Sequence, residues 1–135
     1  MITVSKSDFD RQIVPDDCPD TSYLEQEGFA DRLEQYRQGE FDFIAVRAAV
    51  ELPIPFGKDR ILTRIESPGL WGIESDSGED YLESVFQEES HILADMLAEL
   101  VLAKRLEATK EEIETTIHAH PTLSEAVMEA AGNVG

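Results

Sequence analysis

The spacing of hydrophobic residues changes twice along the chain and predicts a helix, then strands, then a longer helix. Phe29, Leu33 and Tyr36 recur at helical spacing and Gly39 is a stop signal, so we expect a short helix that begins near Thr21 or Ser22. From residue 43 the period becomes two, which is typical of a strand with one strongly apolar side. That side consists of Ile44, Val46, Ala48, Val50 and Leu52. Pro53 and Pro55 are expected to end this strand.

Two further strands and a long helix follow. DRILTRIES, residues 59–67, predicts a second strand, and LWGI, residues 70–73, predicts a third after the turn signal Ser-Pro-Gly. Short connections favour an antiparallel meander. Apolar residues then advance at helical spacing from Leu82 to about residue 106, with acidic residues in the first turns, where the helix dipole favours them.

These elements predict an α+β fold, in which a long helix packs on a small three-stranded antiparallel sheet. Residues 1–20 mix Ser, Asp and Pro and are expected to form an extended arm. Two short helices are expected at the end, because Thr109 with Glu112 and Thr122 with Glu125 have capping-box spacing. We therefore predict a domain at 1–106 and a helical tail at 107–135.

Cysteine content and hydropathy favour a reducing, cytoplasmic setting. Cys18 is the single cysteine, so no internal disulfide can form, and the neighbouring Asp16 and Asp17 disfavour a reactive thiolate. No uncharged run approaches the length of about 18 residues that a membrane span requires. His118 and His120 lack a further ligand at zinc-site spacing, so we predict neither a metal site nor a cofactor.

The chain is strongly acidic, with 29 acidic against 11 basic residues and a formal net charge of −18. This charge opposes direct binding to nucleic acid or to an anionic membrane, and it favours basic protein partners. The segment between Ile65 and Ala103 contains no Lys or Arg. We predict a partner-binding surface there, made by Glu66, Glu74, Asp76, Glu79, Asp80, Glu83 and the aromatic Trp71. A solvated acidic helix face that only keeps the chain soluble is the alternative.

The last third of the chain has a more specific pattern. Residues 91–131, HILADMLAELVLAKRLEATKEEIETTIHAHPTLSEAVMEAA, resemble the end of the dimerisation domain of lipoamide dehydrogenase and related pyridine nucleotide disulfide oxidoreductases. The resemblance implies that His120 corresponds to the acid/base that serves a dithiol, and that Glu125 corresponds to the glutamate that holds it. It also implies that this segment packs at a subunit interface.

Other parts of that chemistry are missing from these 135 residues. There is no GxGxxG motif for FAD or NAD, and Cys18 has no second cysteine with which to form a redox pair. We therefore expect no enzymatic activity, with no catalytic residues, and we expect His120 and Glu125 to act as helix-start structure. The tail is expected either to fold back on its own chain or to form a homodimer.

Residues 1–90 resemble a family of small uncharacterised bacteriophage proteins, above all in DDCPD, YRQGEFDFIAVRA and SPGLWGIESDSGEDYLE. Together with the tail, this resemblance indicates a chimera. The leading hypothesis is a phage-type binding protein that inhibits a basic, nucleic-acid-binding host or defence protein, such as a nuclease, as a DNA mimic. The alternatives are an antitoxin-like neutraliser of a cationic toxin, and a dehydrogenase-tail fragment that acts at a subunit interface.

Overall fold

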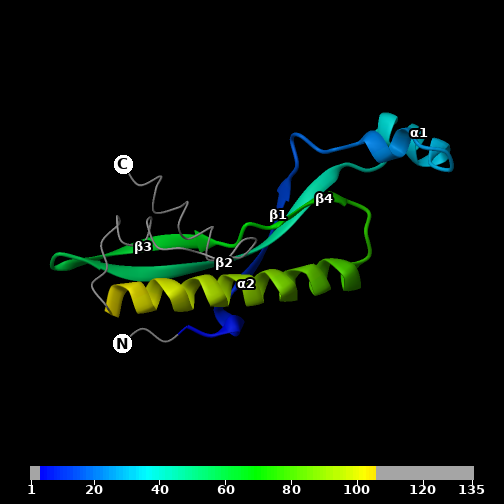
Figure 1. The fold of residues 1–135 in the computed structure, drawn as a ribbon. Coiled ribbons are helices and arrows are strands. Elements are labelled where there is room, and N and C mark those ends of the chain that lie inside the picture. The colour runs from blue at the N-terminus through cyan, green and yellow to red at the C-terminus, as the bar shows by residue number, and fades with distance from the viewer. Residues whose placement is uncertain (1–3, 106–135) are drawn as a thin grey trace.

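The fold is an antiparallel sheet with one long helix along one face and a small helical cap at one end of the other (Figure 1). The computed structural model describes residues 4–105. The elements are η1 (Lys6–Asp8), β1 (Asp10–Pro15), η2 (Ser22–Glu25), α1 (Ala30–Arg37), β2 (Phe43–Phe56), β3 (Asp59–Glu66), β4 (Leu70–Glu74) and α2 (Glu79–Arg105). The predicted α+β class and the long helix are confirmed. The predicted short helix is present as α1, but it begins at Ala30 and not near Thr21 or Ser22. Ser22–Glu25 form the separate 3-10 helix η2, and Gly28 between the two has a φ of 95°, which an α-helix does not contain. The predicted tail, residues 107–135, lies outside the described residues, and the boundary at residue 106 stays a prediction.

All strand pairing in the described part of the chain involves β2. The predicted meander is wrong, because β4 pairs with β2 beyond the point where β3 ends and not with β3 itself. On one edge β1 pairs with the first half of β2, from Ile44 to Ala49. On the other edge β4 pairs near Phe43–Val46 and β3 pairs from Ala49 to Phe56. The predicted extended arm therefore contains a fourth strand. The sequence DRQIVP gives no clear alternation, because its apolar residues Ile13 and Val14 are adjacent, so β1 depends on β2 for its pairing.

The prolines of β2 do not end the strand, contrary to the sequence prediction. The Phe43 carbonyl accepts from Asp16 on the β1 side, whereas the Ala48 carbonyl accepts from Ser67 on the other side. The N–H and C=O groups of successive residues point to opposite edges of a strand. The backbone groups of residues 51, 53 and 55 therefore point towards the same edge as those of Phe43, the β1 edge. β1 pairing stops at Ala49, so Pro53 and Pro55 meet an unpaired edge of the described sheet and interrupt no ladder bond.

One face of β2 packs against α2. Val46 lies with Leu82 and Val85 near the start of the helix. Further along, Ala48 and Val50 pack against Leu93, which is completely buried. The helix and the strand thus bury the apolar faces that result from their periods of 3.6 and 2 residues. Burial of this apolar surface is the main contribution to the stability of the helix–sheet contact.

The opposite face of β2 is capped near its start by η2 and α1. Phe41 and Phe43 are buried with Leu24, and the rings of Tyr36 and Phe43 meet edge to face with centroids 5.3 Å apart. Tyr23 approaches Phe43 in a similar edge-on geometry. Because α1 is only eight residues long, it depends on this aromatic packing for its stability.

The link between β3 and β4 is fixed by contacts to both β2 and α2. Ser67 Oγ accepts from the Ala48 amide at 2.9 Å, and the Gly69 amide donates to Glu89 Oε2 at 2.8 Å. Glu89 is only 6% exposed, so this backbone donor satisfies a carboxylate that the helix buries. Gly69 has a φ of 86°, and an added Cβ would stand 3.2 Å from Arg47 Cβ. Glycine is required here both by backbone conformation and by space.

Replacement of Gly69 by alanine tests this requirement. We expect Gly69→Ala to lower the free energy of unfolding by about 2–3 kcal/mol, because a left-handed backbone strain and a close contact add together. Gly28→Ala is the matched control: φ there is 95°, but nothing lies within 4 Å of the added Cβ. Backbone strain alone should cost Gly28→Ala about 1 kcal/mol. Urea unfolding of both variants measures the difference, and equal losses would show that the contact with Arg47 is unimportant.

Candidate functional site

Most of the acidic residues predicted to bind a partner belong to three groups of internal ion pairs. Glu74 and Asp76 pair with Arg32 of α1, Glu79 and Glu83 pair with Arg11 of β1, and Glu66 pairs with Arg47 and Arg64 of the sheet. These arginine partners were not among the residues predicted from the sequence. Apart from Arg64, which is close to Glu66 in sequence, each arginine comes from a much earlier element, and no local pattern signals the pairing.

The first group, the Arg32 cluster, joins α1 and η2 to the end of β4 and consists of Tyr23, Arg32, Phe41, Glu74 and Asp76. Arg32 Nη2 lies 2.6 Å from Glu74 Oε2 and 2.5 Å from Asp76 Oδ1. The guanidinium carbon also stands 3.7 Å above the ring centre of Phe41, and the Tyr23 hydroxyl donates to Glu74. The cluster therefore holds the helical cap on the sheet through charge, a hydrogen bond and a cation–π contact.

Proton affinities in the Arg32 cluster follow from these contacts. Hydrogen bonding to Asp76 and then Glu74 raises the pKa of Arg32, and the hydrogen bond from Arg32 lowers the pKa of Asp76. Burial, followed by the hydrogen bond to Glu74, raises the pKa of Tyr23 to about 12. At neutral pH Arg32 is therefore a cation, Asp76 is ionised and Tyr23 is a neutral phenol. This distribution favours a structural link over proton transfer.

The second group joins the β1 edge to the start of α2. Arg11 Nη1 lies 2.5 Å from Glu79 Oε1 and 3.3 Å from Glu83 Oε2. The hydrogen bond to Glu79 is the main reason why the pKa of Arg11 is raised. Glu79 and Glu83 are four positions apart on one side of α2, so a single arginine reaches both.

The third group is a polar ladder across the face of the sheet opposite α2. Arg47 Nε donates to Gln12 Oε1 at 2.5 Å, and Arg47 Nη2 lies 3.1 Å from Glu66 Oε2. Arg64 Nε lies 3.0 Å from Glu66 Oε1, and Arg64 Nη1 lies 3.7 Å from Glu51. The ladder links β1, β2 and β3, and cross-strand pairs of opposite charge stabilise the register.

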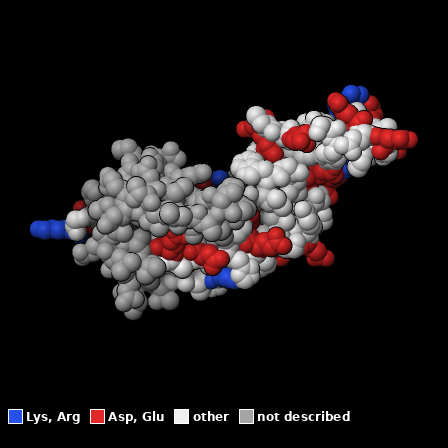
Figure 2. Space-filling view, in the orientation of Figure 1, with Lys and Arg blue, Asp and Glu red and all other residues white. Residues whose placement is uncertain are grey.

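The other two predicted residues lie apart from these groups. Trp71 on β4 is 48% exposed, and its Nε1 donates to the Pro68 carbonyl at 3.0 Å. Asp80 is exposed in the first turn of α2. The face shown in Figure 2 has acidic side chains in separate groups, with basic side chains at both ends of the molecule.

The side chains of the described residues form no metal site. His120 and Glu125, which the resemblance implies as functional residues, lie outside them. Among residues 4–105, no group of three or more His, Cys, Asp or Glu side chains is arranged to hold a metal ion. The helices in the same part of the chain also include none with the length and hydropathy of a membrane span.

Comparison with known proteins reveals a relationship in the C-terminal third. The family described as "Pyridine nucleotide-disulphide oxidoreductase, dimerisation domain" matches residues 90–131. The match begins inside α2, and residues 90–105 of it are described by the structure. This supports the resemblance to the dimerisation domain of lipoamide dehydrogenase, and a dimerisation domain is consistent with the predicted homodimer.

Individual relatives agree with the family match. A dihydrolipoyl dehydrogenase of Bacillus subtilis is 40% identical over 93 residues, which cover 69% of this chain and 17% of the relative. One of Haloferax volcanii is 55% identical over 40 residues, 30% of this chain and 8% of the relative. A leghemoglobin reductase of Vigna unguiculata is 33% identical over 101 residues, 72% of this chain and 16% of the relative. The chain thus spans less than a fifth of these relatives. No solved structure matches it significantly.

The predicted function as a phage-type inhibitor is wrong. The relationship is to an oxidoreductase dimerisation domain, which gives no support to an anti-defence protein, a DNA mimic or a basic protein partner. Net charge was the main reason for that hypothesis, and it specifies a class of partner only weakly. The resemblance of residues 1–90 to phage proteins receives no support from these matches.

Removal of Arg32 tests the structural role of its cluster. Arg32→Gln is expected to destabilise the chain more than Arg37→Gln, because it leaves Glu74 and Asp76 close together without their shared cation. Arg37 is exposed near the end of the same helix and makes no ion pair with a described residue, so its replacement controls for net charge.

The effect of Arg32→Gln should depend on pH. The pKa of Asp76 is lowered in the folded chain, so its pairing contributes stability above the ordinary value of 3.8 and loses it as the pH falls further. Urea unfolding at neutral and acidic pH should show the difference between Arg32→Gln and the wild type shrinking in acid. A difference that is independent of pH would contradict the electrostatic role.

Proposed function

We propose that this chain is a self-association module of the dimerisation-domain type, which forms a homodimer. The observation that carries the proposal is the match of residues 90–131 to a dimerisation domain, which begins at Ser90 in the middle of α2. The N-terminal part of α2, which packs on the sheet, then holds the start of the matched segment in place.

The described part of the matched segment has apolar side chains beyond those that its own sheet buries. Leu93 is completely buried and Leu97 packs against the same core cluster. Ile92 and Met96 are only half-buried, and Leu100 is 37% exposed. A second apolar surface on a helix that already packs on a sheet is typical of a helix that contacts two neighbours.

The proposal assigns association, and not catalysis, to these 135 residues. They contain neither a dinucleotide-binding GxGxxG motif nor a pair of redox cysteines. His120 and Glu125 are accordingly proposed as helix-start structure, with Thr122 as the capping residue. The single cysteine supports the proposed cytoplasmic location, where thiols remain reduced.

Sedimentation equilibrium of the full chain tests the proposal. We expect a concentration-dependent dimer, and we expect Leu100→Asp to raise its dissociation constant about tenfold or more, because a carboxylate would be buried without a partner. Tyr81→Asp is the matched control, since Tyr81 is a 49% exposed residue on the same helix but outside the matched segment. A wild-type chain that remains monomeric at every concentration would exclude the proposal.

Association with a dihydrolipoyl dehydrogenase subunit is a second candidate. It is favoured by the 55% identity over 40 residues with the Haloferax enzyme, since a segment of such similarity can take the place of its counterpart in an interface. The chain in excess should then lower NADH formation by such an enzyme and form a mixed species on a sizing column. Unchanged activity and no mixed species would eliminate this candidate without affecting the homodimer.

A further inference from the structure

The outer edge of β3 is unpaired within the described sheet. β3 is the terminal strand in the order β1-β2-β3, and residues from Asp59 to Leu62 are exposed. Leu62 is 70% exposed, the highest value among the large exposed hydrophobic residues of the described chain, and Ile61 is 49% exposed. Unlike the free edge of β2, the strand from Asp59 to Glu66 contains no proline. Edges of this kind are templates for pairing with another strand.

The register of β3 determines which backbone groups face outward. The Ser67 amide donates to the Ala48 carbonyl of β2, so the backbone groups of Ser67 face β2. The backbone groups of every second residue before it face β2 in the same way, in the pairs Ile65–Val50, Thr63–Leu52 and Ile61–Ile54. The N–H and C=O groups of the intervening residues therefore point away from β2. These outward residues are Arg60, Leu62, Arg64 and Glu66.

We propose that two copies of this chain pair edge to edge through β3, antiparallel, with Thr63 opposite Thr63 of the partner subunit. This inference rests on the proposed self-association and names the surface that performs it. A two-fold axis through an antiparallel pair requires one residue to face its own copy, so the choice of central residue fixes every other pair.

Pairing about Thr63 gives complementary neighbours on both faces. Ile61 stands opposite the partner's Ile65 on the α2 face, and Arg60 stands opposite the partner's Glu66 on the other face. Leu62 and the partner's Arg64 exchange backbone hydrogen bonds. Apolar pairs and pairs of opposite charge are the cross-strand combinations that stabilise sheets.

The adjacent registers are less favourable. A centre at Leu62 places Arg60 opposite the partner's Arg64, and a centre at Arg64 places that arginine opposite its own copy. Like charges directly opposite one another destabilise a pair. The register about Thr63 avoids both contacts.

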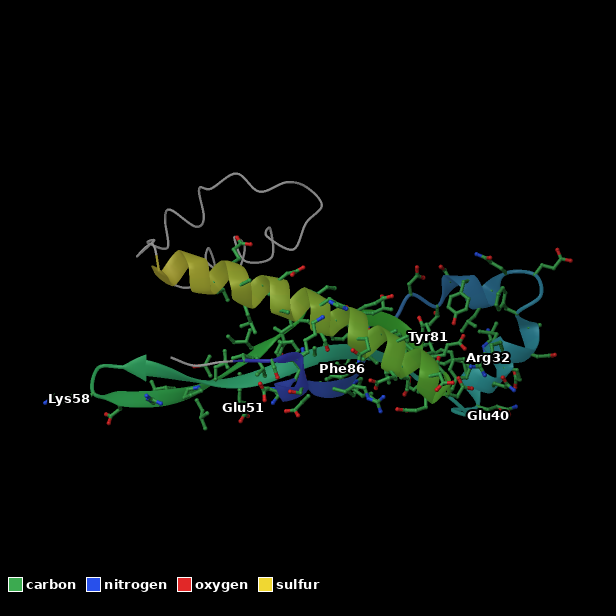
Figure 3. All side chains as sticks on the ribbon, turned by 90° about the horizontal axis from the view of Figure 1, so that it is seen from below. Arg32, Glu40, Glu51, Lys58, Tyr81 and Phe86 are labelled. Atoms are coloured by element: carbon green, nitrogen blue, oxygen red, sulfur yellow. The ribbon has the colours of Figure 1, made fainter. Side chains whose placement is uncertain are left out.

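The charge of this strand suits a second copy of the chain. Lys58, Arg60 and Arg64 offset Asp59 and Glu66 along this segment, so it lacks the acidic excess by which two copies of the chain repel each other. Figure 3 shows Lys58 at the tip of the β2–β3 hairpin, at the opposite end of the molecule from Arg32.

One side of the matched segment of α2 faces the β3–β4 side of the sheet. Glu89, Ile92 and Met96 recur along one side of α2, and Glu89 bonds the Gly69 amide between β3 and β4. The half-buried Ile92 and Met96 therefore lie on the β3–β4 side of the helix. Pairing of β3 would bring this side of each matched segment towards its copy.

Cysteine cross-linking tests the proposed register. In a Cys18→Ser background, Thr63→Cys should form a disulfide-linked dimer on oxidation with copper phenanthroline, because directly opposed residues in a non-hydrogen-bonded pair are within disulfide reach. Gln38→Cys in the same background is the control, since residue 38 is exposed at the end of α1. It should remain largely monomeric under the same conditions.

A backbone variant provides independent evidence. Leu62→Pro removes an outward N–H without interrupting the bonds to β2, and should raise the dissociation constant about tenfold or more. Leu62→Ala keeps that N–H and should weaken the dimer less, and urea unfolding checks that both variants fold.

The outcomes separate this inference from the proposed function. A dimer that shows no cross-link in the Thr63→Cys variant and no sensitivity to Leu62→Pro would overturn β3 pairing and leave self-association intact. Equal cross-linking of the Thr63→Cys and Gln38→Cys variants would also overturn it. A monomeric wild-type chain would overturn both proposals.

Discussion

Hydrogen bonding along β2 is the constraint on which the rest of the structure depends. Its 14 residues form the only strand that pairs on both edges within the described chain, because β1, β3 and β4 each pair with β2. Its two faces are covered differently, by α2 over Val46, Ala48 and Val50 and by the aromatic cap over Phe43. A change of register by one residue would exchange these faces, so the alternation of β2 specifies the position of every neighbouring element.

The scarce basic residues connect elements that are distant in sequence. Arg11 links β1 to α2, Arg32 links α1 to β4, and Arg47 and Arg64 take part in the ladder across the sheet. Much of the acidic segment therefore has an internal role. Exposed ion pairs contribute little individually, but these connect separate layers and orient the cap and helix. Along β3, Arg60 and Arg64 balance Asp59 and Glu66, so this edge carries no net negative charge against a second copy.

The parts of the fold that depend on local periodicity could be predicted from the sequence. The apolar side of β2 and the stripe of α2 follow from spacing, and the last third was similar enough to a known domain to be recognised. β1 could not be predicted, because Ile13 and Val14 show no alternation and their strand forms only on β2. The extension of β2 through Pro53 and Pro55 depends on where β1 stops, which is information from another part of the chain.

The candidate site was harder to predict for the same reason, because Arg32 and Arg11 reach the acidic run from elements more than 40 positions away. The similarity to a dimerisation domain, which depends on residue identities in order, was a more specific signal than net charge.

Amide hydrogen exchange across β3 is the most direct measurement of self-association through this edge. If β3 pairs with its copy, the outward amides of Leu62 and Arg64 become protected as protein concentration rises, while the inward amides of Thr63 and Ile65 are protected at every concentration by β2. Fast exchange of Leu62 and Arg64 in the fully dimeric state would contradict the account.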